Sequence, residues 1–463
     1  MRLCFRIAVI WLVSTWVPTL HAAPRAEGQL EIEIVDKATG VPIAARIHLK
    51  NTRRRPVKLN VAGTAEFGGH FYIDERLTLP LRRGQFTFEI DAGPEYLTQS
   101  GHFEIDRHAD DAKRIEMKRF TDLAKEGWYA ADLDLSRLKR DMPLILRAEA
   151  LNDVRTPDFA TLLGLDPSAA PSPQHGSPDN SVTIAAVPYA WNLPVWLASG
   201  KLDAIQLINR HALREGVVDN EDDGRPRDKS LFPGPSGNGR WSATVYYHVL
   251  NCGLRIPPVA GSGSGTNDNP VGTNRVYVHC GNEFTPERWW EGLEEGRVFV
   301  TNGPLLRPAV DGQPPGYVFP IDSNENLSLE IGLNLATRVP VEYLEIIKDG
   351  EVYADVRLAE WTKKKGRLPP VDFDKSGWFL VRAVTNNPMT YQFASSGPYY
   401  VEKDGLPRIS RRSVHFFIDW IDAAEARIRE LPKLDDAQRK SLLAEQASAR
   451  EFFQQLLTTA NAD

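Results

Sequence analysis

Three oxygen-bearing side chains recur at every second position of one short segment: Asp132, Asp134 and Ser136. Residues two apart in an extended strand face the same side, so the two carboxylates and the hydroxyl would point in one direction. Such oxygens are hard ligands, which suit magnesium or calcium better than zinc or iron. The residue types and their spacing therefore indicate a candidate divalent-metal site, which the surrounding elements would have to position.

The region around this segment, about residues 121–320, has the pattern of an α/β fold. Short apolar runs such as residues 182–187 alternate with helical stretches such as residues 284–295. Strands that alternate with helices predict a parallel α/β layer or barrel. In α/β barrels the site lies at the carboxyl ends of the strands. His211 follows the strand-like run 204–208, so we expect it near that edge.

The flanking regions predict three further units. Residues 28–118 alternate polar and apolar side chains between glycine-containing turns, which predicts a small β-sandwich. Residues 321–403 return to this pattern and predict a second β-rich domain. Residues 408–459 carry an apolar stripe at helical spacing with a break near Pro432. They predict a helical hairpin that packs on the α/β region.

The segment at residues 127–137, G-W-Y-A-A-D-L-D-L-S-R, resembles the first motif of the PHP (polymerase and histidinol phosphatase) superfamily. In the secreted branch of CehA/McbA-type metallohydrolases that motif reads G-W-Y-x-G-D-L-H-x-H. Further segments resemble other signatures of the branch: residues 147–151, 193–203, 247–258 and 296–304. Near the front of the chain, residues 41–47 and 81–86 resemble a carboxypeptidase-regulatory-like module.

The resemblance implies a distorted (β/α)7 barrel flanked by β-sandwich domains, with metal-dependent hydrolysis as the usual chemistry. Imidazole and carboxylate ligands hold the metals, which lower the pKa of a bound water and polarise the scissile bond. This chain departs from those motifs. Asp134 and Ser136 stand where histidines are expected, and Gly263 and Gly265 occupy the ligand positions of the last motif, G-S-D-x-H. Four expected ligands are therefore replaced.

These replacements favour an exported pseudoenzyme, a binding or scaffold protein that uses the vacated pocket and needs no cofactor. The alternative is a hydrolase of phosphoesters, carbamates or amides with a rebuilt site. In that site Asp132, Asp134 and His211 would hold one divalent metal ion, and Glu149 would support it. Each residue also has a structural interpretation. Asp132 would cap a loop, Asp134 would accept backbone amides, and the ring of a partly buried His211 would be satisfied. His248 and His279, in strand-like apolar runs, are expected to pack in the core or at the rim of the barrel.

The first residues predict a secretory signal peptide, residues 1–23. Arg2 and Arg6 precede an apolar run at residues 7–20, which closes on two alanines. The run is too short to span a bilayer, and no other run reaches the roughly 18 apolar residues that a span requires. We therefore expect a secreted or periplasmic protein with no membrane span.

The two cysteines that would remain after processing, Cys252 and Cys280, leave two interpretations open. An oxidising compartment would permit one disulfide between them. Alternatively, they are small buried side chains in adjacent strands.

The charge balance, a formal net charge of −6, gives no indication of nucleic acid or an anionic membrane surface as partner. Six aromatic residues border the expected barrel mouth: Tyr189, Trp191, Trp196, Trp241, Tyr246 and Tyr247. Exposed, they would suit a carbohydrate or another extracellular or envelope ligand; buried, they would belong to the core. The expected partner is thus an unidentified ligand outside the cytoplasm.

Overall fold

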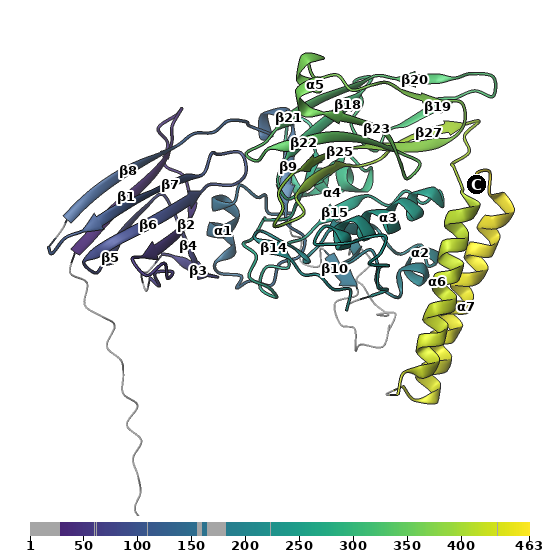
Figure 1. The fold of residues 1–463 in the computed structure, drawn as a ribbon, viewed down its shortest axis with the longest axis horizontal. Helices are drawn as coiled ribbons and strands as arrows, with labels where there is room; N and C mark the ends of the chain where they lie inside the picture. The colour runs from purple at the N-terminus through teal and green to yellow at the C-terminus, as the bar shows by residue number, and fades with distance from the viewer. Residues whose placement is uncertain are drawn as a thin grey trace, which may run out of the picture.

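The computed structural model describes residues 28–463 except 60, 62, 109, 155–159, 164–181, 223 and 433. The segment of the expected signal peptide lies outside these residues. The described chain is a mixed α/β structure, with strands in several sheets and seven α-helices (Figure 1). In that part of the chain, every helix is too short or too polar to cross a bilayer.

The N-terminal part, which we call the sandwich unit (residues 28–117), contains two sheets. Its strands are β1 (Gly28–Asp36), β2 (Ala45–Asn51), β3 (Ala65–Phe67), β4 (His70–Ile73), β5 (Arg76–Leu81), β6 (Gly84–Asp91), β7 (Gln99–Ile105) and β8 (Asp110–Met117). They pair in the orders β5-β1-β8 and β3-β4-β2-β6-β7. Side chains from both sheets, including the fully buried Ile34, Ile47 and Leu79, form one core. The alternating pattern therefore forms a β-sandwich-like pair of sheets, as predicted.

The central unit (residues 121–317) holds the candidate site. Its helices are the 3₁₀ turn η1 (Ala124–Glu126), α1 (Met142–Ala148), α2 (Leu193–Ala198), α3 (Gly237–Asn251) and α4 (Pro286–Glu294). Its strands are β9 (Trp128–Ala131), β10 (Ala160–Leu163), β11 (Val182–Ala185), β12 (Ala204–Ile208), β13 (Ala212–Leu213), β14 (Gly216–Val217), β15 (Pro258–Ala260), β16 (Arg275–His279), β17 (Val298–Thr301) and β18 (Leu305–Val310).

Strands of the central unit are divided between two sheets. Strands β10, β11, β12 and β15 are parallel neighbours, whereas β9, β16 and β17 pair antiparallel in a larger sheet. Just beyond β9 and β15, the Leu133 amide donates to the Ala260 carbonyl at 3.2 Å, so the two sheets meet beside Asp132 and Asp134. The strand pairings of the described residues do not close a barrel.

The larger sheet continues into the β unit (residues 318–403). This unit has strands β19 (Val318–Ile321), β20 (Leu327–Leu329), β21 (Ile331–Ala336), β22 (Val341–Lys348), β23 (Glu351–Arg357), β24 (Val371–Phe373), β25 (Gly377–Thr385), β26 (Phe393–Ser396) and β27 (Tyr399–Lys403), with one helix, α5 (Leu358–Lys363). The order β19-β27-β25-β26-β17-β16-β9 crosses from one unit to the other. Because β26 bonds directly to β17, the two units share one continuous sheet.

Two long helices, α6 (Arg411–Glu430) and α7 (Asp436–Thr459), end the chain and lie side by side (Figure 1). The Ser410 hydroxyl caps α6, and Asp435 begins α7 with a capping box. Trp420 and Phe453 are buried in the core that these helices share with the central unit. The predicted helical stretch is thus present, and it packs on the α/β region.

Two local expectations were wrong. His248 lies in helix α3, not in a strand, and its Nδ1 is 2.9 Å from the Ser413 hydroxyl of α6. Cys252 follows the same helix and Cys280 follows β16, so the two cysteines are not in adjacent strands; both thiols are free. Helix α3 is buried on most of its surface, so its many aromatic and β-branched residues are stabilised by packing although they favour strands.

Candidate functional site

Asp132 holds a loop through backbone amides. One of its carboxylate oxygens accepts the amides of Ser262 at 2.9 Å and Asp134 at 3.2 Å, and the other accepts the amide of Gly272 at 2.7 Å. Burial raises the pKa of Asp132 to about 6, although these hydrogen bonds act in the opposite direction. Both oxygens are therefore occupied by the protein itself, as the loop-capping interpretation expects.

Asp134 is held by an arginine. Nε and Nη2 of Arg210 donate to its carboxylate at 2.8–3.1 Å, and the Asp134 side chain is only 2% exposed. Burial raises the pKa of Asp134, and the Arg210 guanidinium opposes that shift. This bidentate pair neutralises the carboxylate in the way that a metal ion would. The interpretation that Asp134 accepts backbone amides was wrong, because the guanidinium of Arg210 donates to the carboxylate instead.

The glycines of residues 261–265 fill the space beside these carboxylates. A Cβ atom on Gly261 would lie 2.4 Å from the Asp134 Cβ. On Gly263 it would lie 2.6 Å from the Arg210 Cβ, and on Gly265 it would lie 2.1 Å from the Ser136 carbonyl oxygen. Gly263 and Gly265 also have φ of +64° and +109°, which side-chain-bearing residues rarely adopt. The space that the replaced ligands were expected to vacate is therefore closed by neighbouring side chains and, at Gly265, by backbone.

His211 and Glu149 are also engaged elsewhere. The His211 Nδ1 is 3.0 Å from the Val218 carbonyl oxygen, and Glu149 accepts the Arg46 Nε at 2.6 Å. Within the described part of the chain, no three His, Cys, Asp or Glu side chains are placed to hold one metal ion. The structure thus does not gather Asp132, Asp134, Glu149 and His211 into the ligand set that the rebuilt-site alternative requires, because each has a protein partner.

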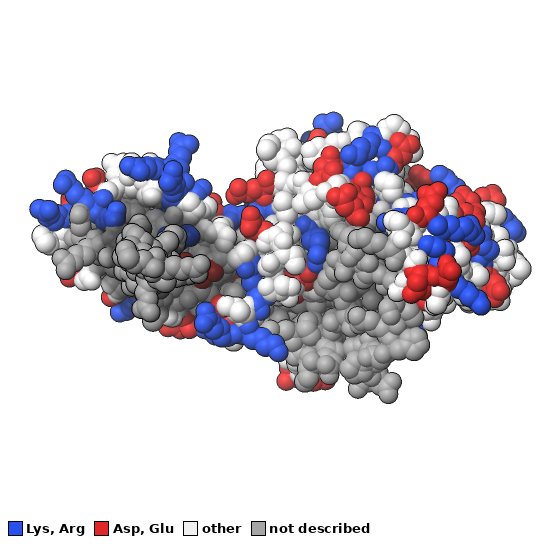
Figure 2. All heavy atoms as spheres, turned by 90° about the horizontal axis from the view of Figure 1, so that it is seen from below, with Lys and Arg blue, Asp and Glu red and all other residues white. Residues whose placement is uncertain are grey.

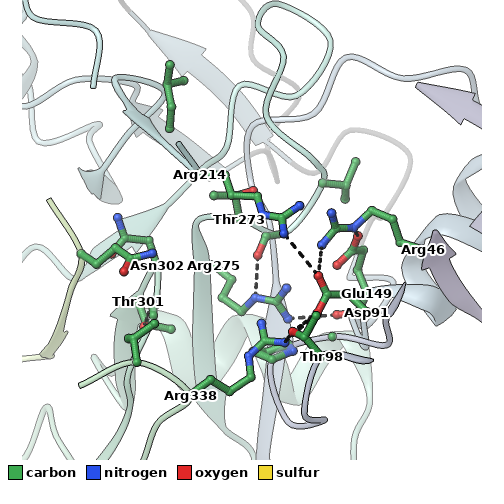
Figure 3. Close-up of a pocket in the computed structure, with 18 of the residues that line it drawn as sticks. Arg46, Asp91, Thr98, Glu149, Arg214, Thr273, Arg275, Thr301, Asn302 and Arg338 are labelled. Carbon is green, nitrogen blue, oxygen red and sulfur yellow. Dashed lines mark hydrogen bonds and ion pairs between the residues drawn. The ribbon is translucent and has the colours of Figure 1, made fainter. Parts of the chain in front are cut away.

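A different cavity, of about 320 Å³, lies where the sandwich, central and β units meet (Figure 3). Charged and amide side chains contribute much of its wall: Arg46, Asp91, Glu149, Arg214, Glu215, Arg275, Asn302, Arg338 and Gln392. We call it the arginine cavity. The sequence gives no sign of this cavity, because its four arginines are far apart in the chain and belong to no local motif.

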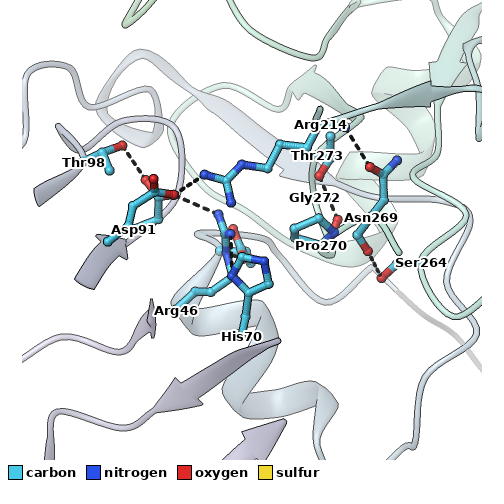
Figure 4. A network of polar contacts seen from close by, with 12 residues as sticks. Arg46, His70, Asp91, Thr98, Arg214, Ser264, Asn269, Pro270, Gly272 and Thr273 are labelled. Atoms are coloured by element: carbon cyan, nitrogen blue, oxygen red, sulfur yellow. Dashed lines mark hydrogen bonds and ion pairs between the residues drawn. The ribbon is translucent and has the colours of Figure 1, made fainter. Parts of the chain in front are cut away.

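Asp91 is the centre of the charged cluster (Figure 4). Its carboxylate is 2.9 Å from Arg46 and 3.6 Å from Arg214, and it accepts the Thr98 hydroxyl at 2.6 Å. Arg338 lies 2.8 Å from the same carboxylate. Burial alone would raise its pKa, but the guanidinium groups and the hydroxyl lower the pKa of Asp91 to about 2. Asp91 therefore stays ionised and holds side chains from three units together.

The same cluster makes its surroundings positive. His70 lies with its Nδ1 3.4 Å from Arg46, and burial together with the Arg46 charge lowers the pKa of His70 to about 3. A histidine that resists protonation to this degree is neutral at any physiological pH. His70 therefore adds no positive charge beside Arg46.

Most of the aromatic residues named above belong to the core. Tyr189, Trp241, Tyr246 and Tyr247 are at most 8% exposed, and only Trp191 and Trp196 are half-buried. The guanidinium of Arg427 covers the ring of Trp191. These residues therefore do not form an exposed aromatic platform for a carbohydrate.

Comparisons with known proteins give little further information. The sequence matches no protein-family model, and no curated protein matches it. Among solved structures, the chain is similar to the fibronectin(III)-like modules of Clostridium thermocellum CbhA. The identity is 15% and the TM-score 0.15, over 29% of this chain and 64% of that chain.

The pKa of Asp132 predicts a pH dependence of stability. Because its folded-state pKa is raised from 3.8 to about 6, its contribution is fully present below about pH 4 and is lost as the pH rises through 6. Between pH 4 and 7.5 we expect this group to lower the free energy of unfolding by up to about 3 kcal/mol. Urea unfolding of the wild type and of Asp132→Asn at several pH values would test this. If the free energy of unfolding of the variant depended on pH as strongly as that of the wild type, the assignment to Asp132 would be refuted.

Proposed function

We propose that this chain is an exported binding or scaffold protein, built on a degenerate PHP-like α/β unit that does not perform metal-dependent hydrolysis. The supporting observation is the bidentate pair of Arg210 with Asp134, a carboxylate only 2% exposed. A guanidinium already provides the positive charge that a metal would bring, so a cation bound there would face repulsion from Arg210. The glycine-lined backbone beside it further reduces the room.

The binding site in this proposal is the arginine cavity and not the vacated metal pocket. The cavity lies between three units, a common position for ligand sites in multidomain proteins, and its volume suits a small molecule. Its charged groups are held by a network of ion pairs, so a ligand would meet a largely pre-formed site.

The surface seen in Figure 2 carries charges of both signs in its described part. On the face seen in Figure 2, basic and acidic side chains lie interspersed over the part that the structure describes. The formal net charge is −6. Binding to nucleic acid or to an anionic membrane would be favoured by an extended basic surface, which that view does not present in its described part.

Metal analysis of the purified mature protein would test the loss of metal chemistry. After extended dialysis, we expect no stoichiometric zinc, iron, manganese, magnesium or calcium in the wild type, because Asp132 and Asp134 already have protein partners. The exposed Asp110→Ala variant serves as the matched control for Asp134→Ala. One equivalent of metal in the wild type and in Asp110→Ala, lost in Asp134→Ala, would contradict the proposal. That result would support hydrolysis of phosphoesters, carbamates or amides.

A further inference from the structure

We infer that the arginine cavity binds the oxyanion group of a small polar ligand, a carboxylate, phosphate or sulfate. This inference rests on the proposed binding function and adds the chemistry of the ligand. Three observations carry it: an excess of positive charge in the buried wall, guanidinium groups with unused donors, and a volume that fits a small molecule.

The charge excess comes from four arginines. Arg46, Arg214, Arg275 and Arg338 line the cavity, whereas Asp91 and Glu149 are its only buried carboxylates among the described residues. The third acidic residue of the wall, Glu215, is exposed to solvent. Glu89, which lies outside the wall, pairs with Arg214, so the buried charge that no carboxylate balances is mainly that of Arg275, and an anion would be attracted to it.

Arg275 contributes most clearly to this excess. It is 4% exposed, and its hydrogen bonds in the described chain run to two backbone carbonyls, those of Gly272 at 2.7 Å and Glu149 at 3.0 Å. It forms no ion pair with a carboxylate among the described residues. A buried guanidinium that faces carbonyl and hydroxyl dipoles but no carboxylate keeps its full charge, which an anionic ligand would offset.

Two other arginines have N–H groups for which the described residues show no acceptor. Nη1 of Arg214 is buried without a hydrogen-bond partner, while its Nη2 pairs with Glu89 and lies 3.6 Å from Asp91. Arg338 uses only Nη1, for Asp91, Tyr96 and Thr98, which leaves Nη2 unused among the described residues. Figure 3 shows both side chains directed at the cluster that lines the cavity. Paired N–H groups on a planar guanidinium match the two oxygens of a carboxylate or phosphate.

The remaining wall can recognise the neutral part of the ligand. The side-chain nitrogen of Gln392 makes no hydrogen bond among the described residues, while its oxygen accepts from Asn387. The volume of about 320 Å³ is at the small end of the range of ligand cavities. These features favour a compact, hydroxylated anion over a long chain or a polymer.

Calorimetric titration of the full mature chain would test the inference, with sodium phosphate, sodium sulfate and sodium glucuronate as separate probes in about 0.15 M NaCl. We expect saturable binding of at least one probe. The affinity should fall at least about tenfold in Arg214→Gln and in Arg338→Gln, because each removes charge-assisted hydrogen bonds. Arg53→Gln removes the same charge from an exposed turn of the sandwich unit and should bind as the wild type does.

Each outcome has a defined meaning. Tightest binding of phosphate or sulfate indicates a phosphorylated or sulfated ligand, and tightest binding of glucuronate indicates a sugar acid. Binding of no probe, or equal binding by wild type and both cavity variants, would overturn the inference. Arg338 is 31% exposed, so Arg338→Gln gives the answer if Arg214→Gln fails to fold.

The metal analysis separates this inference from the proposed function. A metal-free protein that binds no oxyanion would refute only the ligand assignment. Bound metal that is lost in Asp134→Ala would refute the proposed function, whatever the titration shows.

Discussion

Replacing Arg46 with methionine should lower the free energy of unfolding by about 3–5 kcal/mol. The Arg46 side chain is 8% exposed and joins Asp91 at 2.9 Å to Glu149 at 2.6 Å. Methionine keeps much of the packing volume but leaves the Glu149 carboxylate buried without its cation. Asp91 would be affected less, because Arg338 still pairs with it at 2.8 Å. Urea unfolding at neutral pH would measure the loss.

Arg76→Met is the matched control for this experiment. Arg76 also belongs to the sandwich unit and also pairs with two carboxylates, Glu31 and Glu33, but its side chain is 58% exposed. Exposed ion pairs contribute little because water and salt screen them, so we expect hardly any change in that variant. Similar losses in the two variants would contradict the buried role of Arg46. A free energy of unfolding that is higher in Arg46→Met/Glu149→Met than in Arg46→Met would support this role.

The second large effect concerns Arg210. Arg210→Met should also cost about 3–5 kcal/mol, because it leaves the Asp134 carboxylate, 2% exposed, without a partner. Asp134→Leu alone should be destabilising as well, since it leaves the guanidinium half of the pair unmatched. Chemical unfolding of both single variants would measure these losses.

The double variant Arg210→Met/Asp134→Leu distinguishes an ion pair from mere packing. A buried pair that is replaced by apolar side chains of similar volume often costs little, so the double variant should be clearly more stable than Arg210→Met. Additive losses would show that the two side chains do not depend on each other. Retention of a divalent metal by Arg210→Met, and not by the wild type, would show that the arginine excludes the cation.

Features that depend on local pattern could be predicted from the sequence. The alternation at residues 28–118 indicated strands, and sheets β5-β1-β8 and β3-β4-β2-β6-β7 are present there. The helical stretch at residues 284–295 contains α4, and the break near Pro432 separates α6 from α7. In each case the period of the apolar residues or a proline determines the element without help from distant residues.

Features that depend on distant contacts could not be predicted. The segment around His248 has strand-forming residues, yet burial on most sides makes it helix α3. The partner of Asp134 could not be predicted for a similar reason: Arg210 is next to His211 in the sequence, but its approach to Asp134 depends on how the two sheets meet. The arginine cavity needs residues from three units, and no spacing in the sequence connects Arg46 with Arg338.

The glycine loop would make a PHP-type metal site difficult to build into this chain. Restoring ligands by Gly263→Asp and Gly265→His would place side chains where φ is +64° and +109°, against Arg210 and the Ser136 carbonyl. Asp134→His would at the same time remove the counter-ion of Arg210. An engineer who wanted a catalyst would therefore have to rebuild the path of two backbone segments. Exchanging four residues would not be enough, because the backbone itself would have to move.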